Sequence, residues 1–281
     1  MRSWLFVPAD SERKFARASA GEADALILDL EDSILPPNKP AARAGARAML
    51  GAPRGRQLRW VRINALETGL ALEDLAAVMP AAPDGIVLPK STGAEHVRQL
   101  GHWLDAFEAA HGLPPGRTRI LAIAAETGAS LFGLGGYAQA GPRLAGLTWG
   151  AEDLSADLGG LANRAGGAWL GPHRLARDLC LAAAAAAGVA AIDTVHVEIN
   201  DLDGLAEDAR AARRDGFAGK TVIHPSHVAP VNAAFTPAPE ELDWARRVVA
   251  AFADGGAGAS RLDGKMLDQP HLRLARRLLG Q

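Results

Sequence analysis

The chain has 281 residues, of which 48% are hydrophobic and 22% are charged, and its formal net charge is −2 at pH 7. This length fits one large α/β domain better than two small domains. Its 30 basic residues nearly balance its 32 acidic residues, which excludes a general electrostatic attraction to nucleic acid or to an anionic membrane. We therefore expect neither as a partner, and an anionic ligand must be held by local groups.

Three features indicate a soluble, cytoplasmic protein. The apolar run Ser3–Pro8 is followed by no small-residue cleavage site, so it resembles a first strand and not a signal peptide. The longest uncharged run, Leu179–Ile192, is too short to span a bilayer. Cys180 has no second cysteine with which to form a disulfide, and it lies in an Ala- and Leu-rich helical stretch where a buried structural thiol is expected.

Short apolar runs alternate with helical stretches along the chain, which is the pattern of βα units in a parallel sheet. About eight such alternations fit a (β/α)₈ (TIM) barrel better than an open doubly wound sheet. The fold class is therefore predicted as α/β. The predicted strands are residues 3–8, 25–30, 58–63, 85–89, 120–125, 144–150, 191–199 and 221–224.

The C-terminal segment exceeds what a barrel needs. Residues 239–253 predict a helix, a glycine-rich loop follows at 254–260, and a last helix follows Pro270. We expect residues 1–236 to form the catalytic barrel. Residues 237–281 are then a helical extension that acts as a lid, as a contact with a neighbouring subunit, or as both.

Polar side chains are concentrated where the predicted strands end, which is the rim where barrel enzymes carry their active sites. Any one of these acids could belong to a structural ion pair, but burying the whole set without a ligand would be costly. The set comprises Asp29, Glu31, Asp32, Arg62, Asn64, Lys90, Glu126, Glu152, Asp153, Glu198, Asp201 and His224.

Glu126 and Asp153 each end a short apolar run. Two carboxylates with room left for waters and a substrate are a usual way to hold Mg²⁺. Arg62 could grip a substrate carboxylate and face an oxygen that becomes negative during reaction, although a rim salt bridge to Asp29 or Glu31 is the alternative. We expect the acids after the second strand to orient this arginine or metal-bound waters.

Other chemistries have less support. Lys90 could form a Schiff base, but the neighbouring acid pair favours chemistry in which a cation stabilises the developing charge. His224 could be a base, yet a histidine before a proline at a strand end is more often a packed, hydrogen-bonded residue. No Gly-x-Ser-x-Gly elbow is present, and Gly133–Gly136 does not lie between a strand and a helix as a phosphate loop would.

Eight separated segments, which occur in order over nearly the whole chain, resemble the citrate lyase β-subunit family within the HpcH/HpaI aldolase group. The resemblance implies a TIM barrel that is oligomeric and often trimeric. It also implies a carbon–carbon lyase acting between an acyl thioester and a 2-oxo acid. The segments are Arg2–Ala9, Ala23–Ser33, Val61–Asn64, Val87–Lys90, Ala125–Thr127, Trp149–Gly159, Gly219–Ser226 and Leu262–Asp268.

The resemblance also implies roles for individual residues. Glu126 and Asp153 match the Mg²⁺ ligands of the family, and Arg62 with Glu126 matches its substrate-binding pair. Asp268 matches an aspartate that reaches from the lid into a neighbouring subunit's site, where it serves as an acid or base. The basic residues that resemble positions near the phosphates of the thioester carrier are Arg13, Lys14 and Lys39.

Departures from the family pattern concern the substrate and not the metal pair. Trp169–Arg174 stands where relatives often carry a Tyr-Ala-Arg-Ser-like segment, His227 replaces a usual glutamine, and Arg17 replaces a common lysine. The expected activity is cleavage of a malyl-, citramalyl- or citryl-CoA type thioester. The alternatives are a citryl-acyl-carrier-protein lyase subunit, a malyl-CoA thioesterase-like hydrolase, and a catalytically silent assembly subunit.

Overall fold

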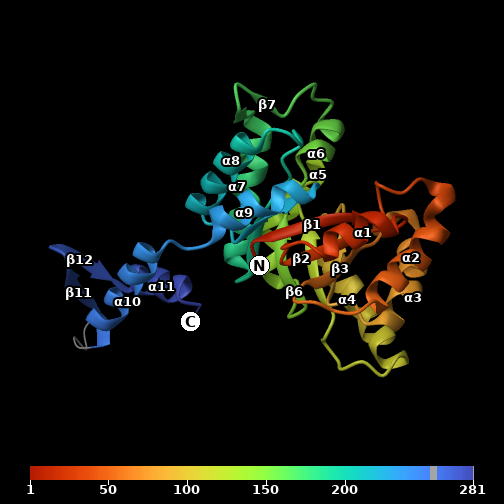
Figure 1. Ribbon diagram of the computed structural model, residues 1–281, viewed down its shortest axis with the longest axis horizontal. Helices are drawn as coiled ribbons and strands as arrows, with labels where there is room; N and C mark the ends of the chain where they lie inside the picture. Colours follow the sequence, from red (N-terminus) through yellow and green to blue (C-terminus); the bar gives the residue numbers. More distant parts are fainter. Residues whose placement is uncertain (254–257, 281) are drawn as a thin grey trace. The chain divides into compact units, whose positions relative to one another are not determined.

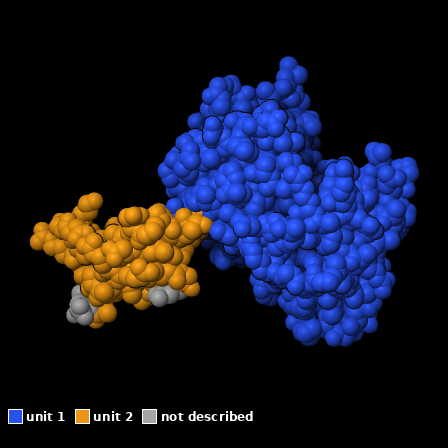
Figure 2. Space-filling model, in the orientation of Figure 1, with its two compact units in different colours: residues 1–235 blue, residues 236–281 orange. Residues whose placement is uncertain are grey.

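The computed structural model describes residues 1–253 and 258–280. The chain separates into two compact units, Met1–Phe235 and Thr236–Gln281, which are coloured differently in Figure 2. Each unit encloses a hydrophobic cluster of its own. Within the described residues, no helix combines the length and apolar character needed to cross a bilayer.

The first unit is a closed barrel of parallel strands (Figure 1). Each strand pairs with the next one along the barrel, and the last strand pairs with the first, so the ring has no free edge. This confirms the predicted (β/α)₈ barrel. The barrel strands are β1 (Ser3–Pro8), β2 (Ala25–Asp29), β3 (Leu58–Arg62), β4 (Gly85–Leu88), β5 (Arg119–Ile123), β6 (Leu144–Thr148), β9 (Ala190–Asp193) and β10 (Gly219–Val222).

Helices connect these strands and cover the outside of the barrel (Figure 1). They are α1 (Glu12–Ser19), α2 (Lys39–Gly51), α3 (Ala71–Val78), α4 (Ala94–Ala110), α5 (Gly128–Gly133), α6 (Ala151–Leu158), α7 (Gly171–Ala186), α8 (Leu202–Asp215) and α9 (Val228–Phe235). Short 3₁₀ turns are η1 (Pro36–Asn38), η2 (Leu66–Thr68), η3 (Met79–Ala81), η4 (Leu134–Gln139) and η5 (Pro225–His227).

The seventh barrel strand is shorter than predicted. The apolar run 191–199 was expected to be one strand, but β9 ends at Asp193. Val195 and Ile199 line a cavity instead. The apolar residues past Asp193 are not buried as strand residues would be, because Val197 is 47% exposed and Ile199 is 44% exposed.

A small hairpin, β7 (Arg164–Ala165) and β8 (Ala168–Trp169), lies between α6 and α7 and was not predicted. Its turn is formed by Gly166 and Gly167, which have φ values of 56° and 81°. Positive φ at both turn positions is what a two-residue type I′ hairpin requires.

Strand alternation sorts the core into an inner and an outer layer. Trp4, Ile27 and Trp60 belong to the cluster inside the barrel, whereas the residues between them pack against the helices. Gly85 makes room for this filling, because a Cβ there would lie 2.2 Å from the Trp60 ring. The same alternation turns the side chains two positions further along β2 and β3 toward the C-terminal mouth of the barrel.

The second unit contains α10 (Pro239–Ala253), β11 (Ala259–Leu262), β12 (Lys265–Asp268) and α11 (Gln269–Leu278). Part of the expected glycine-rich loop, residues 254–257, lies outside the described residues. The two strands form an antiparallel hairpin whose turn residues, Asp263 and Gly264, have φ values of 47° and 76°. Asp-Gly is a favoured sequence for this type of turn.

Candidate active site

Arg62 ends β3 and is held by two acids from the end of β2. Its Nε and Nη2 donate to Asp29 Oδ1 and Oδ2, both at 2.7 Å, and its Nη1 lies 2.8 Å from Glu31 Oε2. Burial works against ionised Asp29, but the charge and hydrogen bonds of Arg62 outweigh it and lower the pKa of this carboxyl. The salt bridge weighed from the sequence is thus present. It holds the guanidinium in one orientation, with N–H groups left over on both terminal nitrogens.

Glu126 follows β5 and is almost fully buried, at 2% exposure. Its Oε2 accepts the backbone N–H of Lys90 at 2.6 Å. Gly150 accommodates it, because a Cβ at that position would lie 2.8 Å from Glu126 Cγ. Burial, followed by the negative charges of Asp153 and Glu31, raises the pKa of Glu126 to about 8.

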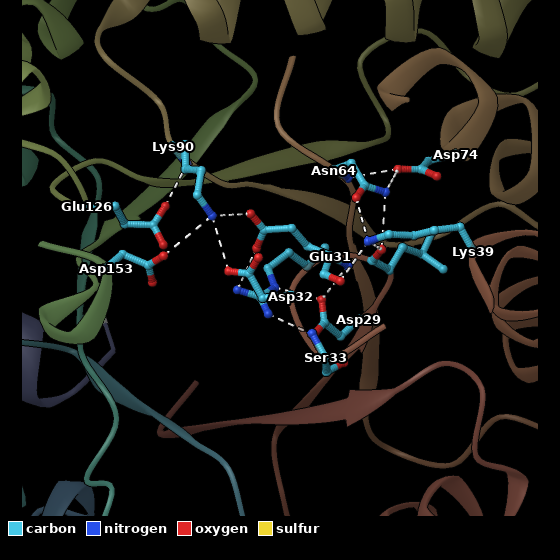
Figure 3. A network of polar contacts seen from close by, with 12 residues as sticks. Asp29, Glu31, Asp32, Ser33, Lys39, Asn64, Asp74, Lys90, Glu126 and Asp153 are labelled. Carbon is cyan, nitrogen blue, oxygen red and sulfur yellow. Dashed lines mark hydrogen bonds and ion pairs between the residues drawn. The ribbon is translucent and has the colours of Figure 1, made fainter. Parts of the chain in front are cut away.

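Asp153 lies in the first turn of α6, directly after β6. Figure 3 shows its carboxylate beside that of Glu126, with Glu126 directed toward the backbone of Lys90 and Asp153 toward the Lys90 ammonium. Lys90 Nζ lies 3.5 Å from Asp153 Oδ1. The adjacent Glu152 instead accepts from Asn163 Nδ2 at 2.6 Å. Of these consecutive acids, Asp153 is therefore the one that joins Glu126.

The pair fits a hard divalent cation. Carboxylate oxygens are the preferred ligands of Mg²⁺, which is commonly held by one or two carboxylates and keeps several waters. Among the described residues, no group of three or more His, Cys, Asp or Glu side chains forms a metal cage. Burial is the main reason that the pKa of Glu126 is raised, and the negative charge of Asp153 raises it further, so the two ionised carboxylates repel each other. A cation between them would relieve this repulsion.

A cavity of about 660 Å³ opens beside Arg62 and Asp29. Its wall is largely apolar, and basic side chains from α1 are exposed on one side. Arg13 and Lys14 are among them, together with Arg17, which sequence reasoning noted only as a departure from the family pattern. The lining residues are Leu5, Phe6, Val7, Pro8, Arg13, Lys14, Arg17, Ala18, Asp29, Ser33, Arg62, Val195, Ile199, Ile223, His224 and Pro225.

Lys39 does not line this cavity. Its ammonium donates at 2.7 Å to three acceptors, namely the carbonyl oxygens of Leu30 and Glu31 and the side-chain oxygen of Asn64. An ammonium has three N–H donors, so all are used inside the chain. We therefore assign Lys39 to fixing the loop after β2 and no longer to carrier binding.

Two other rim residues have structural partners. His224 lines the cavity, but its Nδ1 lies 2.6 Å from Ser226 Oγ within the η5 turn. Asp201 accepts the backbone N–H of Gly204 at 2.9 Å and caps the start of α8.

Cys180 is fully buried, which raises the pKa of its thiol, as expected for an inert structural thiol.

Asp268 belongs to the second unit, where it ends β12 and caps α11. Its Oδ1 lies 2.6 Å from Nδ1 of His271, and the same nitrogen accepts the Asp268 backbone N–H at 3.3 Å. The Asp268 side chain is 47% exposed. The carboxylate is thus oriented by its own helix and still accessible to a ligand.

Sequence reasoning missed the central position of Lys90. Its ammonium reaches Glu31, Asp32 and Asp153 (Figure 3). The position at the end of β4 was a signal, but it was weighed only for a Schiff base. The backbone φ of Lys90, 51°, is unusual for a residue other than glycine and has no signature in the sequence.

Comparison with known families identifies the family to which this chain belongs. A family model described as HpcH/HpaI aldolase/citrate lyase matches residues 2–225. The chain belongs to this family of carbon–carbon lyases. A second model, described as C–C bond lyase of the TIM-barrel fold, matches residues 175–281 of this aldolase-family member. Both matches confirm the resemblance seen in the sequence.

Individual proteins of this family are similar to this chain over nearly its whole length. A citrate lyase subunit beta-like protein of Mycobacterium tuberculosis is 39% identical over 98% of this chain and 93% of its own length. A (3S)-malyl-CoA thioesterase of Cereibacter sphaeroides is 34% identical over 100% of this chain and 94% of its own. The crystal structure of M. tuberculosis CitE with magnesium, acetoacetate and coenzyme A has a TM-score of 0.79 and 38% identity, covering 99% of this chain and 97% of that one.

Proposed function

We propose that this protein is an Mg²⁺-dependent lyase that cleaves a 3-hydroxyacyl-CoA into an acyl-CoA and a 2-oxo acid. The observation that carries the proposal is the Glu126–Asp153 pair (Figure 3) together with the Asp29-bound Arg62, which interacts electrostatically with Glu126 and lines a cavity. The magnesium and coenzyme A in the crystal structure of the M. tuberculosis relative support the same assignment.

Glu126 and Asp153 would hold the metal. When bound, Mg²⁺ supplies positive charge that draws the substrate's carboxylate and hydroxyl oxygens together and stabilises negative charge on them. The carboxylate of Glu126 is already aimed by the Lys90 N–H and the space at Gly150, so little reorganisation is needed when the site fills.

Arg62 would bind the oxo-acid half of the substrate. Because Asp29 fixes its plane at two points, the remaining N–H groups present a rigid donor edge to an oxygen that gains charge. Transfer of the hydroxyl proton to a base or to solvent leaves an alkoxide, whose electrons form the carbonyl of the 2-oxo acid as the adjacent carbon–carbon bond breaks. The electrons of the breaking carbon–carbon bond then pass to the α-carbon of the thioester, which leaves as an enolate.

We assign protonation of that enolate carbon to Asp268, supplied by the C-terminal unit of a neighbouring copy in a homotrimer. Its exposure and its orientation by His271 suit it to donate a proton to a ligand. In the reverse direction the same carboxylate would remove a proton from the acyl thioester. Size-exclusion chromatography with light scattering tests the trimer directly.

The carrier would occupy the cavity next to Arg62. Arg13, Lys14 and Arg17 project exposed positive charge at its edge and suit the phosphates of coenzyme A. The apolar wall, which includes Leu5, Val7 and Val195, suits the uncharged part of the carrier arm. An acyl carrier protein would present the same arm without the nucleotide phosphates.

The decisive experiment incubates purified protein with Mg²⁺ and malyl-, citramalyl- or citryl-CoA, and separately with acetyl-CoA and a panel of 2-oxo acids. Mass spectrometry should detect an acyl-CoA with a 2-oxo acid in the first case and a 3-hydroxyacyl-CoA in the second. Addition of EDTA should abolish both. Absence of product from every CoA substrate would contradict the proposal and favour an acyl-carrier-protein substrate or a silent assembly subunit.

A second candidate function is hydrolysis of the thioester, favoured by the similarity to the C. sphaeroides (3S)-malyl-CoA thioesterase. The same bound substrate would be attacked by water at the thioester carbonyl. This reaction releases free coenzyme A and the intact hydroxy acid. A thiol reagent that reports free coenzyme A therefore distinguishes it from cleavage of the carbon–carbon bond.

A further inference from the structure

Lys90 contacts both acids of the proposed metal pair and two further acids that follow β2. Its ammonium lies 2.5 Å from Glu31 Oε1, 3.1 Å from Asp32 Oδ2 and 3.5 Å from Asp153 Oδ1. Its backbone N–H donates to Glu126 Oε2 at 2.6 Å. Figure 3 shows the ammonium between the Glu126–Asp153 pair and the acids that follow β2. One residue thus links carboxylates that follow three different strands.

The backbone at this position is held in an uncommon conformation. Lys90 has a φ of 51°, in the left-handed region that is unfavourable for a residue with a side chain. The next residue is fixed on both sides: Ser91 N donates to Ile123 O at 3.2 Å, and the buried Tyr137 hydroxyl donates to Ser91 O at 3.1 Å. The surroundings therefore enforce the conformation that gives Lys90 both sets of contacts.

The contacts of the ammonium differ in strength. Glu31 is nearly buried, with a side chain 6% exposed, and accepts at the shortest distance. Asp153 is 33% exposed and lies at the longest distance. A lysine ammonium is a compact single charge on a flexible stem. A divalent cation on Asp153 would repel this charge and compete with it for the same oxygen.

We propose that Lys90 is a resident counter-cation of the metal site, which neutralises Asp153 in the metal-free protein, releases it when Mg²⁺ arrives, and thereby weakens Mg²⁺ binding. The inference rests on the proposed function, because it needs Glu126 and Asp153 to be the ligands. Lys90 is a positioning residue in this scheme. Its ammonium remains on Glu31 after the exchange, and its N–H holds Glu126 throughout.

The test measures Mg²⁺ binding to metal-stripped protein by isothermal titration calorimetry. Lys90→Met removes the charge but keeps the backbone N–H, and we expect its Kd for Mg²⁺ to be about tenfold lower than that of the wild type. Arg210→Met is the matched control. It removes one positive charge from an exposed ion pair with Glu207 on α8, and the Kd should stay within about twofold because exposed charges are screened.

Lys90→Gly is a second variant, because glycine adopts positive φ without strain. It should show the same tighter binding as Lys90→Met even if methionine destabilises the fold. Mg²⁺ should also raise the unfolding midpoint of both variants more than that of the wild type. Equal or weaker Mg²⁺ binding by both variants, with normal binding by the wild type, would overturn the role of Lys90 alone. No binding by any of the proteins, wild type included, would overturn both the metal site and this inference.

Discussion

Asp29 and Arg62 form a two-point ion pair across neighbouring strands, with Oδ1–Nε and Oδ2–Nη2 distances of 2.7 Å. Asp29 also accepts the backbone N–H groups of Glu31 and Ser33 at 2.9 and 3.3 Å. The carboxylate therefore shapes the loop after β2 at the same time as it orients the guanidinium. A change at Asp29 should affect the reaction through Arg62.

We expect Asp29→Asn to lower kcat/KM by about 100-fold, as for other residues that orient a ligand-binding side chain. The variant should also lose about 2 kcal/mol of unfolding free energy, because a buried charged hydrogen bond is broken. Asp24→Asn is the control. Asp24 comes directly before β2, at the opposite end of the strand from Asp29, and forms ion pairs with Arg2 and Arg56. It should lose stability and keep kcat/KM. Equal activity losses in the two variants would refute the orienting role.

The stability of the metal-free protein should fall as pH rises, because of Glu126. Burial raises the pKa of this carboxyl from 4.5 to about 8. Below about pH 4.5 it is protonated in both the folded and the unfolded chain. Between these values the folded chain holds a proton that the unfolded chain has released, so the free energy of unfolding falls by up to roughly 1.4 kcal/mol per pH unit. Above about pH 8 both states are ionised and the loss is complete.

Urea denaturation in EDTA at several pH values checks this prediction. Glu126→Gln has no such proton to lose, so the difference in unfolding free energy between it and the wild type should change across this window. Saturating Mg²⁺ should remove the loss of wild-type stability with rising pH, because the metal stabilises the ionised carboxylate. A difference that stays constant from pH 5 to pH 8 in EDTA would contradict the raised pKa.

Basic residues on α1 should act in substrate binding and not in the chemical step. We expect Arg13→Gln combined with Lys14→Gln to raise KM for a CoA thioester at least about tenfold with little change in kcat, because each loses a charge-assisted contact to phosphate. A short N-acetylcysteamine thioester lacks these phosphates and should be turned over alike by variant and wild type. An equal rise in KM for both substrates would show that the cavity binds something other than the carrier phosphates.

Asp268→Asn tests the proposed acid or base. Asparagine is also a good N-cap residue, so α11 should persist, while kcat should fall by about 10² to 10⁴ with little change in KM. The matched control is Asp263→Asn in the neighbouring turn. Asp263 has a φ of 47°, which asparagine tolerates equally well. Unchanged kcat in Asp268→Asn would remove this residue from the mechanism.

The sequence was sufficient for the barrel because each strand is a short apolar run between helices, and a run of that kind reports burial directly. It also identified the rim residues, since parallel strands in a barrel all end on one side. Which side chains contact one another at the rim was harder to predict. Nothing near Lys39 in the sequence reveals that its ammonium donates to Asn64. The contacts of Lys90 depend on a backbone conformation that its neighbours in space enforce. The apolar residues after Asp193 were misread as strand because apolar composition predicts burial, whereas Val197 and Ile199 are exposed beyond the end of β9.

The packing of Glu126 into the space at Gly150 has a further consequence. These residues follow β5 and β6, and Asp153 lies only three residues beyond Gly150, so the close approach that glycine allows brings the two proposed metal ligands together. Van der Waals contact is not screened by dissolved ions, whereas attraction between exposed charges on α1 and a phosphate is. Rising ionic strength should therefore weaken capture of the carrier long before it disturbs the spacing of the two carboxylates.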